Sequence, residues 1–397
     1  MSGSLASERA LRVAVAGTGA FGRNHLRVYR ELETASQGVA LAAAVEPDAK
    51  RAAEIAEKYA IPVFASVDEL LTADLKLDAA SVAVPTVHHH AVAAPLLDAG
   101  LDLLVEKPLA ASLSEADDLL VRAEKGKRIL QPGHLERFNP AVLAVETKLR
   151  RPMFFEAHRL SIFTPRALDV DVVLDLMIHD LDIVLTFANS PVREVRAVGL
   201  PILSPKVDIA NVRVEFESGC VANFTASRVS TERVRKLRFF EPRQYVSIDY
   251  ARRDVLVIRI DEKHQALTAD ALLGALPAHI AAMVPRKIAE DVVAGRVDAA
   301  TIAKYAAMAG VDPALVAQFT QPASPTAGLS FSKPAIEPGE PLRLEIESFL
   351  DSVRTRREPH VTARQGREAL ALALEIQASM AAHAVRAGLE DFFSPGA

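Results

Sequence analysis

The sequence predicts an α/β protein with an N-terminal domain built on a doubly wound parallel sheet and a C-terminal α/β domain with a large, mostly antiparallel open sheet. Over residues 1–135, short apolar runs alternate with amphipathic ones, which is typical of βαβ units. After about residue 140, polar and apolar residues alternate with a period of two, as they do in half-buried strands. A length of 397 residues suits two domains.

The expected strands of the first domain are short and mostly apolar, as parallel strands buried on both faces are. The segments between them predict helices, two of which begin with capping boxes at Ser66-x-x-Glu69 and Ser112-x-x-Glu115. We expect strands at 11–16, 39–45, 63–65, 79–84, 101–105 and 128–130, and helices at 20–32, 48–59, 67–71, 88–99 and 113–124.

The second domain, residues 136–397, combines many strands with few helices. A tract with five prolines at 322–341 cannot hold a helix or an inner strand, so we predict that 265–340 is a helical and proline-rich insertion ending in a long loop. The expected strands are 153–162, 192–199, 212–216, 220–228, 237–240, 245–250 and 255–260; the expected helices are 168–187, 269–276, 278–293, 299–309, 341–354 and 363–387.

Composition excludes several classes of protein. The formal net charge of −5 argues against a nucleic-acid-binding protein, which usually carries a basic domain or stripe. A single cysteine, Cys220, excludes an intramolecular disulfide and a Cys-rich metal site. The N-terminus lacks the apolar core of a signal peptide, and the most apolar stretch, 79–100, is interrupted by prolines, histidines and Asp98. We therefore expect a cytoplasmic protein with a small-molecule substrate and no nucleic-acid or membrane partner.

A glycine-rich turn follows the first expected strand and opens the first expected helix. In Gly17-Thr18-Gly19-Ala20-Phe21-Gly22, the first glycine permits a tight turn and the second lets the backbone approach a pyrophosphate. The third lets helix and strand pack closely, and the helix N-terminus faces the phosphates. Strand, glycines and helix in this order predict a dinucleotide-binding Rossmann domain, although a glycine-rich turn without a ligand is an alternative.

Glu46 ends the second expected strand, 24 residues after Gly22. An acidic residue at this place accepts hydrogen bonds from the adenosine ribose and repels a 2′-phosphate, which favours NAD over NADP. The alternative is a solvated carboxylate at a helix start, because Pro47 and Asp48 follow it.

Two further groups of residues suit catalysis. Glu106-Lys107-Pro108 follows a buried strand, where ligands of doubly wound sheets bind, and a lysine there can stabilise a developing alkoxide. Asp175 and His179 lie four residues apart in an expected helix, so both side chains share one face. Histidine titrates near neutrality, as a general base must.

Less specific interpretations of these residues remain open. Lys107-Pro108 alone is typical of a surface turn, and Asp175 with His179 could be a helix-surface pair. A metal site is a further alternative, although no second histidine occurs at ligand spacing, and we predict none. Its ligands would come from Asp169, Asp171, Asp175, His179 and Asp180.

Taken together, these motifs resemble the glucose–fructose oxidoreductase / inositol dehydrogenase (Gfo/Idh/MocA) family. The resemblance covers 11–260 and 341–380, and it includes Pro85-Thr86-x-x-His89 between the glycine turn and Glu106. It implies a Rossmann domain followed by an open-sheet domain, and NAD(P)-dependent oxidation or reduction of a sugar or cyclitol carbon. Lys107 and His179 would be the catalytic pair, with Asp175 assisting. The family often has Asn where this chain has Thr86, which leaves that contact in doubt.

Residues 133–140 and 159–171 resemble the branch of the family that oxidises nucleotide-linked amino sugars. This resemblance implies hydride transfer from C3 of UDP-N-acetylglucosamine to NAD. Arginine can hold a diphosphate through bidentate contacts, although internal ion pairs are as plausible for any single one. The implied substrate-binding residues are Arg137, Phe138, Asn139, Arg159 and Arg166.

Two other functions compete with this hypothesis. A relative could keep NAD bound and use transient oxidation to cleave glycosides, and a regulator could sense NAD without turnover. The presence of both Lys107 and His179 argues against a regulator. We expect a homodimer or homotetramer, in which the insertion at 265–340 could be an oligomer contact, a lid or a partner surface.

Overall fold

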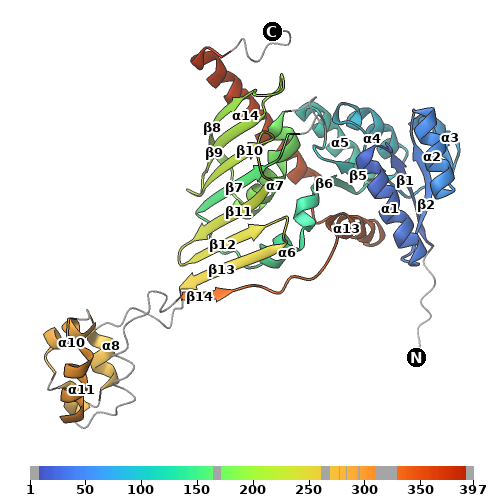
Figure 1. Ribbon diagram of the computed structural model, residues 1–397. Helices are drawn as coiled ribbons and strands as arrows, with labels where there is room; N and C mark the ends of the chain where they lie inside the picture. The colour runs from blue at the N-terminus through green and yellow to red at the C-terminus, as the bar shows by residue number, and fades with distance from the viewer. Residues whose placement is uncertain are drawn as a thin grey trace, which may run out of the picture. The chain divides into compact units, whose positions relative to one another are not determined.

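A six-stranded parallel sheet forms the first half of the molecule in the computed structural model (Figure 1). The structure describes residues 9–163, 171–260, 269–276, 278–282, 284–293, 296–308 and 329–389. The strand order is β3-β2-β1-β4-β5-β6, so the order reverses between β1 and β4, where Rossmann domains bind their ligands. The strands are β1 Leu11–Ala16, β2 Val39–Val45, β3 Val63–Phe64, β4 Ala79–Val82, β5 Asp102–Glu106 and β6 Leu130–Gly133.

Helices cover both faces of this sheet. Successive residues of a strand point to opposite faces, so they pack into two separate hydrophobic cores. Val13 and Val15 of β1 pack against α1, whereas Ala14 and Ala16 pack against α4 and α5. Ser66 and Ser112 cap α3 and α5 by accepting from the backbone N–H groups of Glu69 and Glu115. The glutamate side chains accept from the N–H groups of Ala65 and Ala111, one residue before each N-cap, so the two predicted capping boxes are formed only in part. The helices are α1 Ala20–Thr34, α2 Ala49–Tyr59, α3 Val67–Thr72, α4 His89–Asp98 and α5 Leu113–Gly126.

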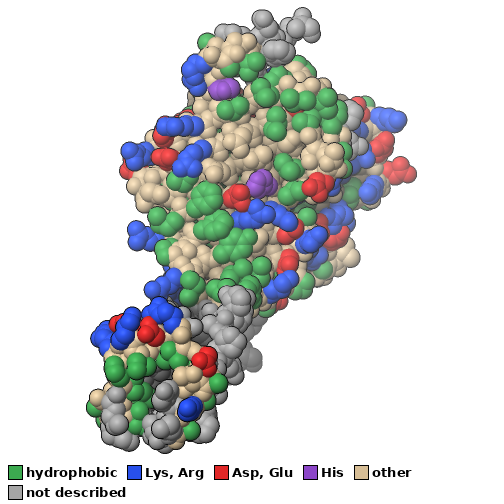
Figure 2. All heavy atoms as spheres, turned by 60° about the vertical axis from the view of Figure 1, so that its left-hand side comes forward, with side chains coloured by type: hydrophobic (Ala, Val, Ile, Leu, Met, Phe, Trp, Pro, Cys, Tyr) green, Lys and Arg blue, Asp and Glu red, His purple; other side chains and the backbone are tan. Residues whose placement is uncertain are grey.

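An eight-stranded sheet of order β14-β13-β12-β11-β7-β10-β9-β8 follows, and its β7–β10 pair is parallel. The α/β class and the mostly antiparallel second sheet are therefore confirmed. Figure 2 shows charged side chains of both signs among hydrophobic ones on the side of the molecule that it brings forward. The strands are β7 Phe154–Leu160, β8 Val192–Leu200, β9 Ile209–Phe216, β10 Val221–Ser227, β11 Val234–Glu241, β12 Gln244–Asp249, β13 Asp254–Ile260 and β14 Leu329–Ser332.

The helix predicted at 168–187 differs from an ordinary α-helix. Val173–Met177 forms a π-helix, η3, which continues into α7, Ile178–Ala188; residues 164–170 lie outside the described part of the chain. A π-helix has more residues per turn than an α-helix, so the expected i, i+4 alignment of Asp175 with His179 is shifted. Two short segments precede β7: the 3₁₀-helix η2, Leu135–Phe138, and α6, Pro140–Glu146.

The chain divides into two compact units, the second of which is Arg243–Tyr245 with Leu256–Lys333. This unit contains α8 Ala269–Ala275, α9 Ala278–Ala281, α10 Arg286–Val293 and α11 Ala299–Met308. It also contains β14, where the sequence analysis predicted only a loop. β14 pairs with β13 so that Leu329 lies opposite Ile260, and the stretch 261–328 is therefore inserted between the two strands of one hairpin.

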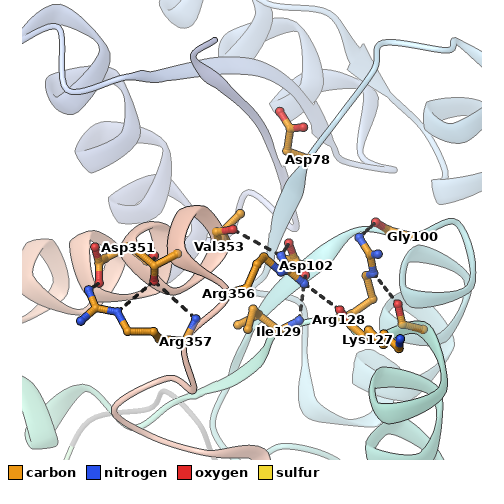
Figure 3. A network of polar contacts seen from close by, with 12 residues as sticks. Asp78, Gly100, Asp102, Lys127, Arg128, Ile129, Asp351, Val353, Arg356 and Arg357 are labelled. Atoms are coloured by element: carbon orange, nitrogen blue, oxygen red, sulfur yellow. Dashed lines mark hydrogen bonds and ion pairs between the residues drawn. The ribbon is translucent and has the colours of Figure 1, made fainter. Parts of the chain in front are cut away.

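Helix α13, Pro341–Thr355, packs against the first sheet although it follows the second in sequence. Ile346 and Phe349 are fully buried in the same core as α1. Beyond its end, Arg356 donates to both carboxylate oxygens of Asp102 on β5, and Asp102 accepts from the backbone N–H of Ile129 at 2.7 Å (Figure 3). These contacts attach the C-terminal part of the chain to the edge of the Rossmann sheet.

The last helix, α14 Ala363–Ala387, packs on β8 and α7, and its Leu370 enters the Rossmann core. A capping box at Thr362 and Gln365 begins this helix. None of the helices in the described ranges is both long enough and apolar enough to span a bilayer.

Candidate active site

A cavity of about 650 Å³ lies at the carboxyl ends of β1, β2 and β4, where the strand order reverses. Gly17 lines it with a φ of +88°, and a Cβ at this position would lie 2.7 Å from the carbonyl oxygen of Ala83. A Cβ at Gly22 would lie 1.9 Å from the carbonyl oxygen of Gly17, so only glycine fits where α1 crosses the turn.

Gly19 differs from the other two glycines. It has a φ of −62°, and a Cβ there would meet no protein atom within 4 Å. The free space therefore lies beside the N-terminus of α1, which Ala20 begins, and which favours anions. The residues present fit a dinucleotide, whose pyrophosphate would take the space at Gly19.

Glu46 faces the same cavity but its carboxylate is engaged within the protein. Oε2 accepts from the N–H and the hydroxyl of Thr18 at 3.2 and 2.7 Å, and Oε1 accepts from Asp48 N–H and Arg51 at 3.0 Å each. Burial alone would raise the pKa of Glu46, but these donors outweigh it and keep the pKa below its ordinary value. Both the carboxylate and the half-exposed Arg51 line the cavity, so they determine the charge that a ribose 2′-substituent would meet.

A second cavity of about 430 Å³ adjoins the first, since Ala83 and Val84 line both. It brings together residues from both parts of the first unit: Lys107 from the end of β5, Asp175 from η3 and His179 from α7. Its remaining walls are Phe21, His89, Glu106, Gly133, Leu135, Glu136, Arg159, Leu176 and Arg235. The predicted catalytic residues therefore line one cavity next to the glycine turn.

Asp175, which the sequence analysis placed on one helix face with His179, contacts Lys107 instead. The Nζ of Lys107 donates to the backbone oxygen of Asp175 at 2.7 Å and lies 3.7 Å from the carboxylate Oδ1. Burial lowers the pKa of Lys107, although the charges of Asp175 and Glu106 oppose the change. Within the described ranges, no hydrogen bond joins Asp175 to His179, so Asp175 positions the lysine rather than the imidazole.

The imidazole of His179 is neutral in this environment. Burial, followed by the positive charges of Lys107 and Arg159, lowers the pKa of His179 well below its ordinary value. Nδ1 is buried and has no hydrogen-bond partner within the structure described. A neutral ring with a free nitrogen can accept a proton.

His25 and Glu106 form a buried pair that the sequence analysis did not find. His25 Nε2 lies 2.9 Å from Oε1 of Glu106, next to Lys107 in the chain. The ring of Phe21 packs edge-on against His25 at 5.6 Å between centroids. No sequence signal links residues so far apart, because His25 looks like any residue on the buried face of α1.

The residues of the Pro85-Thr86-x-x-His89 motif take different positions. Pro85 lines the first cavity, and Thr86 begins a short 3₁₀-helix, η1 Thr86–His88, without lining either cavity. His89 is buried, with Nδ1 2.8 Å from the oxygen of Pro108 and Nε2 3.0 Å from that of Val84. It therefore joins the segments that follow β4 and β5, and burial lowers its pKa.

The residues predicted to hold a substrate diphosphate have internal partners. Arg159 binds Asp180 through Nε and Nη2 at 2.7 and 3.0 Å, and Glu136 through Nη1 at 3.0 Å. Arg137 is 2 % exposed and donates to Thr186. Phe138 and Asn139 are also buried, and Asn139 caps α6; Arg166 lies outside the described residues. Arg159 alone among the described four lines the second cavity.

The carboxylates considered as metal ligands also have other roles. Asp171 accepts from the N–H groups of Val173 and Leu174 at the start of η3, and Asp180 pairs with Arg159. Asp169 lies outside the described residues.

Comparison with known proteins adds to this geometry. The chain matches the model of the oxidoreductase family with an NAD-binding Rossmann fold over residues 11–134, and that of the GFO/IDH/MocA C-terminal domain over residues 141–242. It is 38% identical over 241 residues to UDP-N-acetylglucosamine 3-dehydrogenase of Acidithiobacillus ferrooxidans, which covers 60% of this chain and 74% of that protein. It is 30% identical over 202 residues to inositol 2-dehydrogenase of Acidothermus cellulolyticus, covering 49% and 58% of the two chains.

Solved structures show the same architecture. The Acidithiobacillus ferrooxidans enzyme superposes with a TM-score of 0.73 at 29% identity, covering 94% of this chain and 98% of that one. A dehydrogenase from Chromobacterium violaceum, solved with NADH and UDP-GlcNAcA, gives a TM-score of 0.68 over 95% of both chains. At 15% identity, that likeness shows the fold alone.

Proposed function

Since the chain belongs to the Gfo/Idh/MocA family of NAD-binding oxidoreductases, we propose that it catalyses the NAD-dependent oxidation of UDP-N-acetylglucosamine at C3 of the sugar. The observation that carries the proposal is the position of Lys107 and His179 in one cavity beside the glycine turn. The 38% identity to an enzyme with this activity supports the choice of substrate.

The cofactor would be held by the first cavity. The N-terminus of α1 and the backbone at Gly17 and Gly19 would bind its pyrophosphate, and the side of the cavity formed by Glu46 would face the adenosine ribose. Bound NAD supplies the acceptor for the hydride that leaves the substrate carbon.

Lys107 and His179 would act on the substrate hydroxyl. The ammonium of Lys107 donates a hydrogen bond to the hydroxyl oxygen and stabilises the negative charge that develops there. His179 would accept the hydroxyl proton while the C–H bond breaks and the C=O bond forms, which leaves a ketone and a proton on His179. The lowered pKa of Lys107 supports the exchanged assignment as well, with Lys107 as the acceptor of the proton.

Asp175 would act through Lys107. Its backbone oxygen and carboxylate both lie near Nζ, so they fix the direction of the ammonium and favour its charged form. Lys107 extends from the cofactor domain and Asp175 from the following domain, which makes the hydrogen bond between them a link across the cavity.

The test is a substrate panel with purified protein. NADH absorbance is followed with NAD and UDP-N-acetylglucosamine, free N-acetylglucosamine or myo-inositol, and the product is identified by mass after reduction with borodeuteride. We expect turnover with UDP-N-acetylglucosamine and deuterium at C3. Turnover with inositol alone, or sugar release without accumulation of NADH, would overturn the proposal in favour of a cyclitol dehydrogenase or an NAD-dependent glycosidase.

A further inference from the structure

One cation of the second cavity has no counter-ion in the part of the chain that the structure describes. Arg235 lies on β11 and lines the cavity together with Lys107 and His179. Its Nε is buried and has no hydrogen-bond partner, and no hydrogen bond or ion pair engages its guanidinium group among the residues that the structure describes. A buried Nε–H donor without a partner is costly, because it loses its hydration and gains nothing in return, although the Arg235 side chain as a whole is only partly buried.

The neighbouring strand makes this position less favourable still. Arg235 lies directly opposite Arg159 in the β11–β7 pair. Like charges directly opposite on paired strands destabilise a sheet. Arg159 is neutralised by Asp180 and Glu136, but Arg235 is not, and burial together with Arg159 lowers the pKa of Arg235.

The carboxylates around the cavity are already engaged. Glu136 binds Arg159 and Asn139, Asp175 faces Lys107, and Glu106 pairs with His25. These carboxylates therefore leave the guanidinium group of Arg235 open to an anionic group of a bound molecule. The phosphates of a dinucleotide would lie at Gly19 in the first cavity, which leaves the anion to the substrate.

We propose that Arg235 binds the anionic group of the substrate, the diphosphate if the substrate is the UDP-sugar proposed above, on which this assignment rests. A guanidinium group recognises phosphate and carboxylate through the same paired N–H donors. The diphosphate contact that the resemblance implied for Arg137, Arg159 and Arg166 is thus made by a different arginine. Arg235 contributes affinity for the substrate and leaves hydride transfer to Lys107 and His179.

The test compares Arg235→Leu, Arg235→Lys and a control, Arg238→Leu. Arg238 lies on the same strand but pairs with Glu156 and does not line the cavity. UDP binding to the NADH-loaded protein is measured by calorimetry. We expect Arg235→Leu to weaken UDP binding by about ten- to a hundredfold, Arg235→Lys by less, and Arg238→Leu not at all. Equal UDP affinity in wild type and Arg235→Leu would overturn the proposal.

Kinetics separate a binding role from a structural one. In Arg235→Leu the KM for UDP-N-acetylglucosamine should rise by a similar factor, with kcat nearly unchanged and NADH affinity unaltered. The thermal midpoint should stay constant or rise, because a positive charge directly opposite Arg159 is removed. Loss of kcat together with cofactor affinity, as expected for a structural defect, would count against the proposal, and Arg235→Lys provides the same test if the leucine variant does not fold.

A second set of ligands distinguishes failure of the anion site from failure of the proposed function. If the wild type does not oxidise UDP-N-acetylglucosamine, the same variants are titrated with N-acetylglucosamine 1-phosphate, glucuronate and neutral N-acetylglucosamine. Arg235-dependent binding of the phosphate or of the carboxylate keeps the anion site and identifies its ligand. Binding of neither anion to the wild type, or binding that does not depend on Arg235, rejects it.

Discussion

The ammonium of Lys107 donates a hydrogen bond of 2.7 Å to the backbone oxygen of Asp175, while the Asp175 carboxylate lies 3.7 Å from the same nitrogen. The direction of the lysine thus depends on the π-helical backbone, and its charge depends on the carboxylate. Substitution of the Asp175 side chain therefore changes the charge environment of Lys107 but leaves the backbone contact that directs it.

Asp175→Asn should therefore keep Lys107 in place but lower its pKa further, since the carboxylate is the main charge that raises this pKa. The limb of the kcat/KM profile that reports deprotonation of Lys107 should move to lower pH, with NAD affinity unchanged. The pH profiles of wild type and variant provide the measurement. An unshifted limb would show that Lys107 does not titrate in the profile or that Asp175 does not control it.

His179→Ala and Lys107→Met should each reduce turnover without loss of NAD binding. A general base contributes ~10²–10⁴-fold and an oxyanion donor ~10²–10³-fold. Because both groups would act on one hydroxyl, the double variant should lose less than the product of the two single losses. Single-turnover rates of the four proteins test this, and NADH fluorescence measures cofactor affinity separately. Near-normal turnover in one single variant would remove that residue from the mechanism.

Gly19→Ala should separate cofactor binding from folding. The backbone φ of −62° suits alanine and no protein atom lies within 4 Å, so the loss of stability should be no more than about 1 kcal/mol. The methyl group would take the space that a pyrophosphate needs, and the Kd for NAD should rise at least roughly tenfold, which corresponds to ~1.4 kcal/mol. Gly22→Ala is the contrasting variant, because its methyl group would overlap the backbone of Gly17 and lower the thermal midpoint. Unchanged NAD affinity in Gly19→Ala would contradict the assignment of the first cavity.

Glu46→Ser should shift cofactor preference from NAD towards NADP. The substitution removes a charge that repels a 2′-phosphate and frees Arg51, which is 47% exposed and now pairs with Glu46. A change of roughly tenfold in the ratio of the two dissociation constants is expected, because a like charge at close range is worth ~1 kcal/mol or more. Adding Arg51→Ala should reverse the gain for NADP. Equal affinity of the wild type for both cofactors would contradict the preference for NAD.

Glu345→Gln should stabilise the protein at alkaline pH. Glu345 on α13 is fully buried and neither carboxylate oxygen has a partner in the described structure. Burial, then the charges of Glu106 and Asp182, raise the pKa of Glu345 well above 4.5. The folded state therefore holds a proton that the unfolded state releases, and stability is lost as the pH rises above 4.5 towards the folded pKa.

The neutral amide removes this loss. The thermal midpoint of Glu345→Gln should exceed that of wild type at pH 8, and the difference should shrink towards pH 5. Glu347→Gln is the matched control and should show no such trend, because Glu347 is half-exposed on the same helix and pairs with Arg343. A wild-type advantage at pH 8 would mean that Glu345 is charged and stabilised by groups such as bound water.

Local geometry explains which parts of this molecule could be predicted from sequence. A Cβ at Gly17 would meet Ala83 just after the adjacent strand, and one at Gly22 would meet Gly17. These contacts are local, so the spacing of the glycines is enough to predict the turn. The fold class is confirmed for a similar reason, because the periods of the apolar residues differ between parallel and antiparallel strands. The prediction that Lys107 and His179 act together came from the resemblance to a family, because their separation in the sequence does not indicate it.

Contacts between distant residues could not be predicted in this way. Nothing in the sequence near Arg159 indicates that Asp180 and Glu136 neutralise it, nor that Arg235 opposite it has no ion pair with any described residue. A π-helix stands at Asp175 where an α-helical turn was expected, and its backbone oxygen accepts from Lys107, 68 residues away, which no local pattern indicates. The short strand β14 was missed because its alternation of Leu329 and Phe331 with serines spans only four residues and lies within a tract rich in prolines.

The return of α13 to the Rossmann sheet has a consequence for synthesis of the chain. Helix α13 contributes five residues to a core whose other buried members precede residue 130: Leu342, Ile346, Phe349, Leu350 and Val353. At ~5–20 residues per second, the ribosome needs roughly 10–40 s to translate residues 134–340 between them. Throughout that interval α13 is missing from the side of the sheet on which α1 packs. The domain that is translated first therefore cannot finish folding until the chain is almost complete.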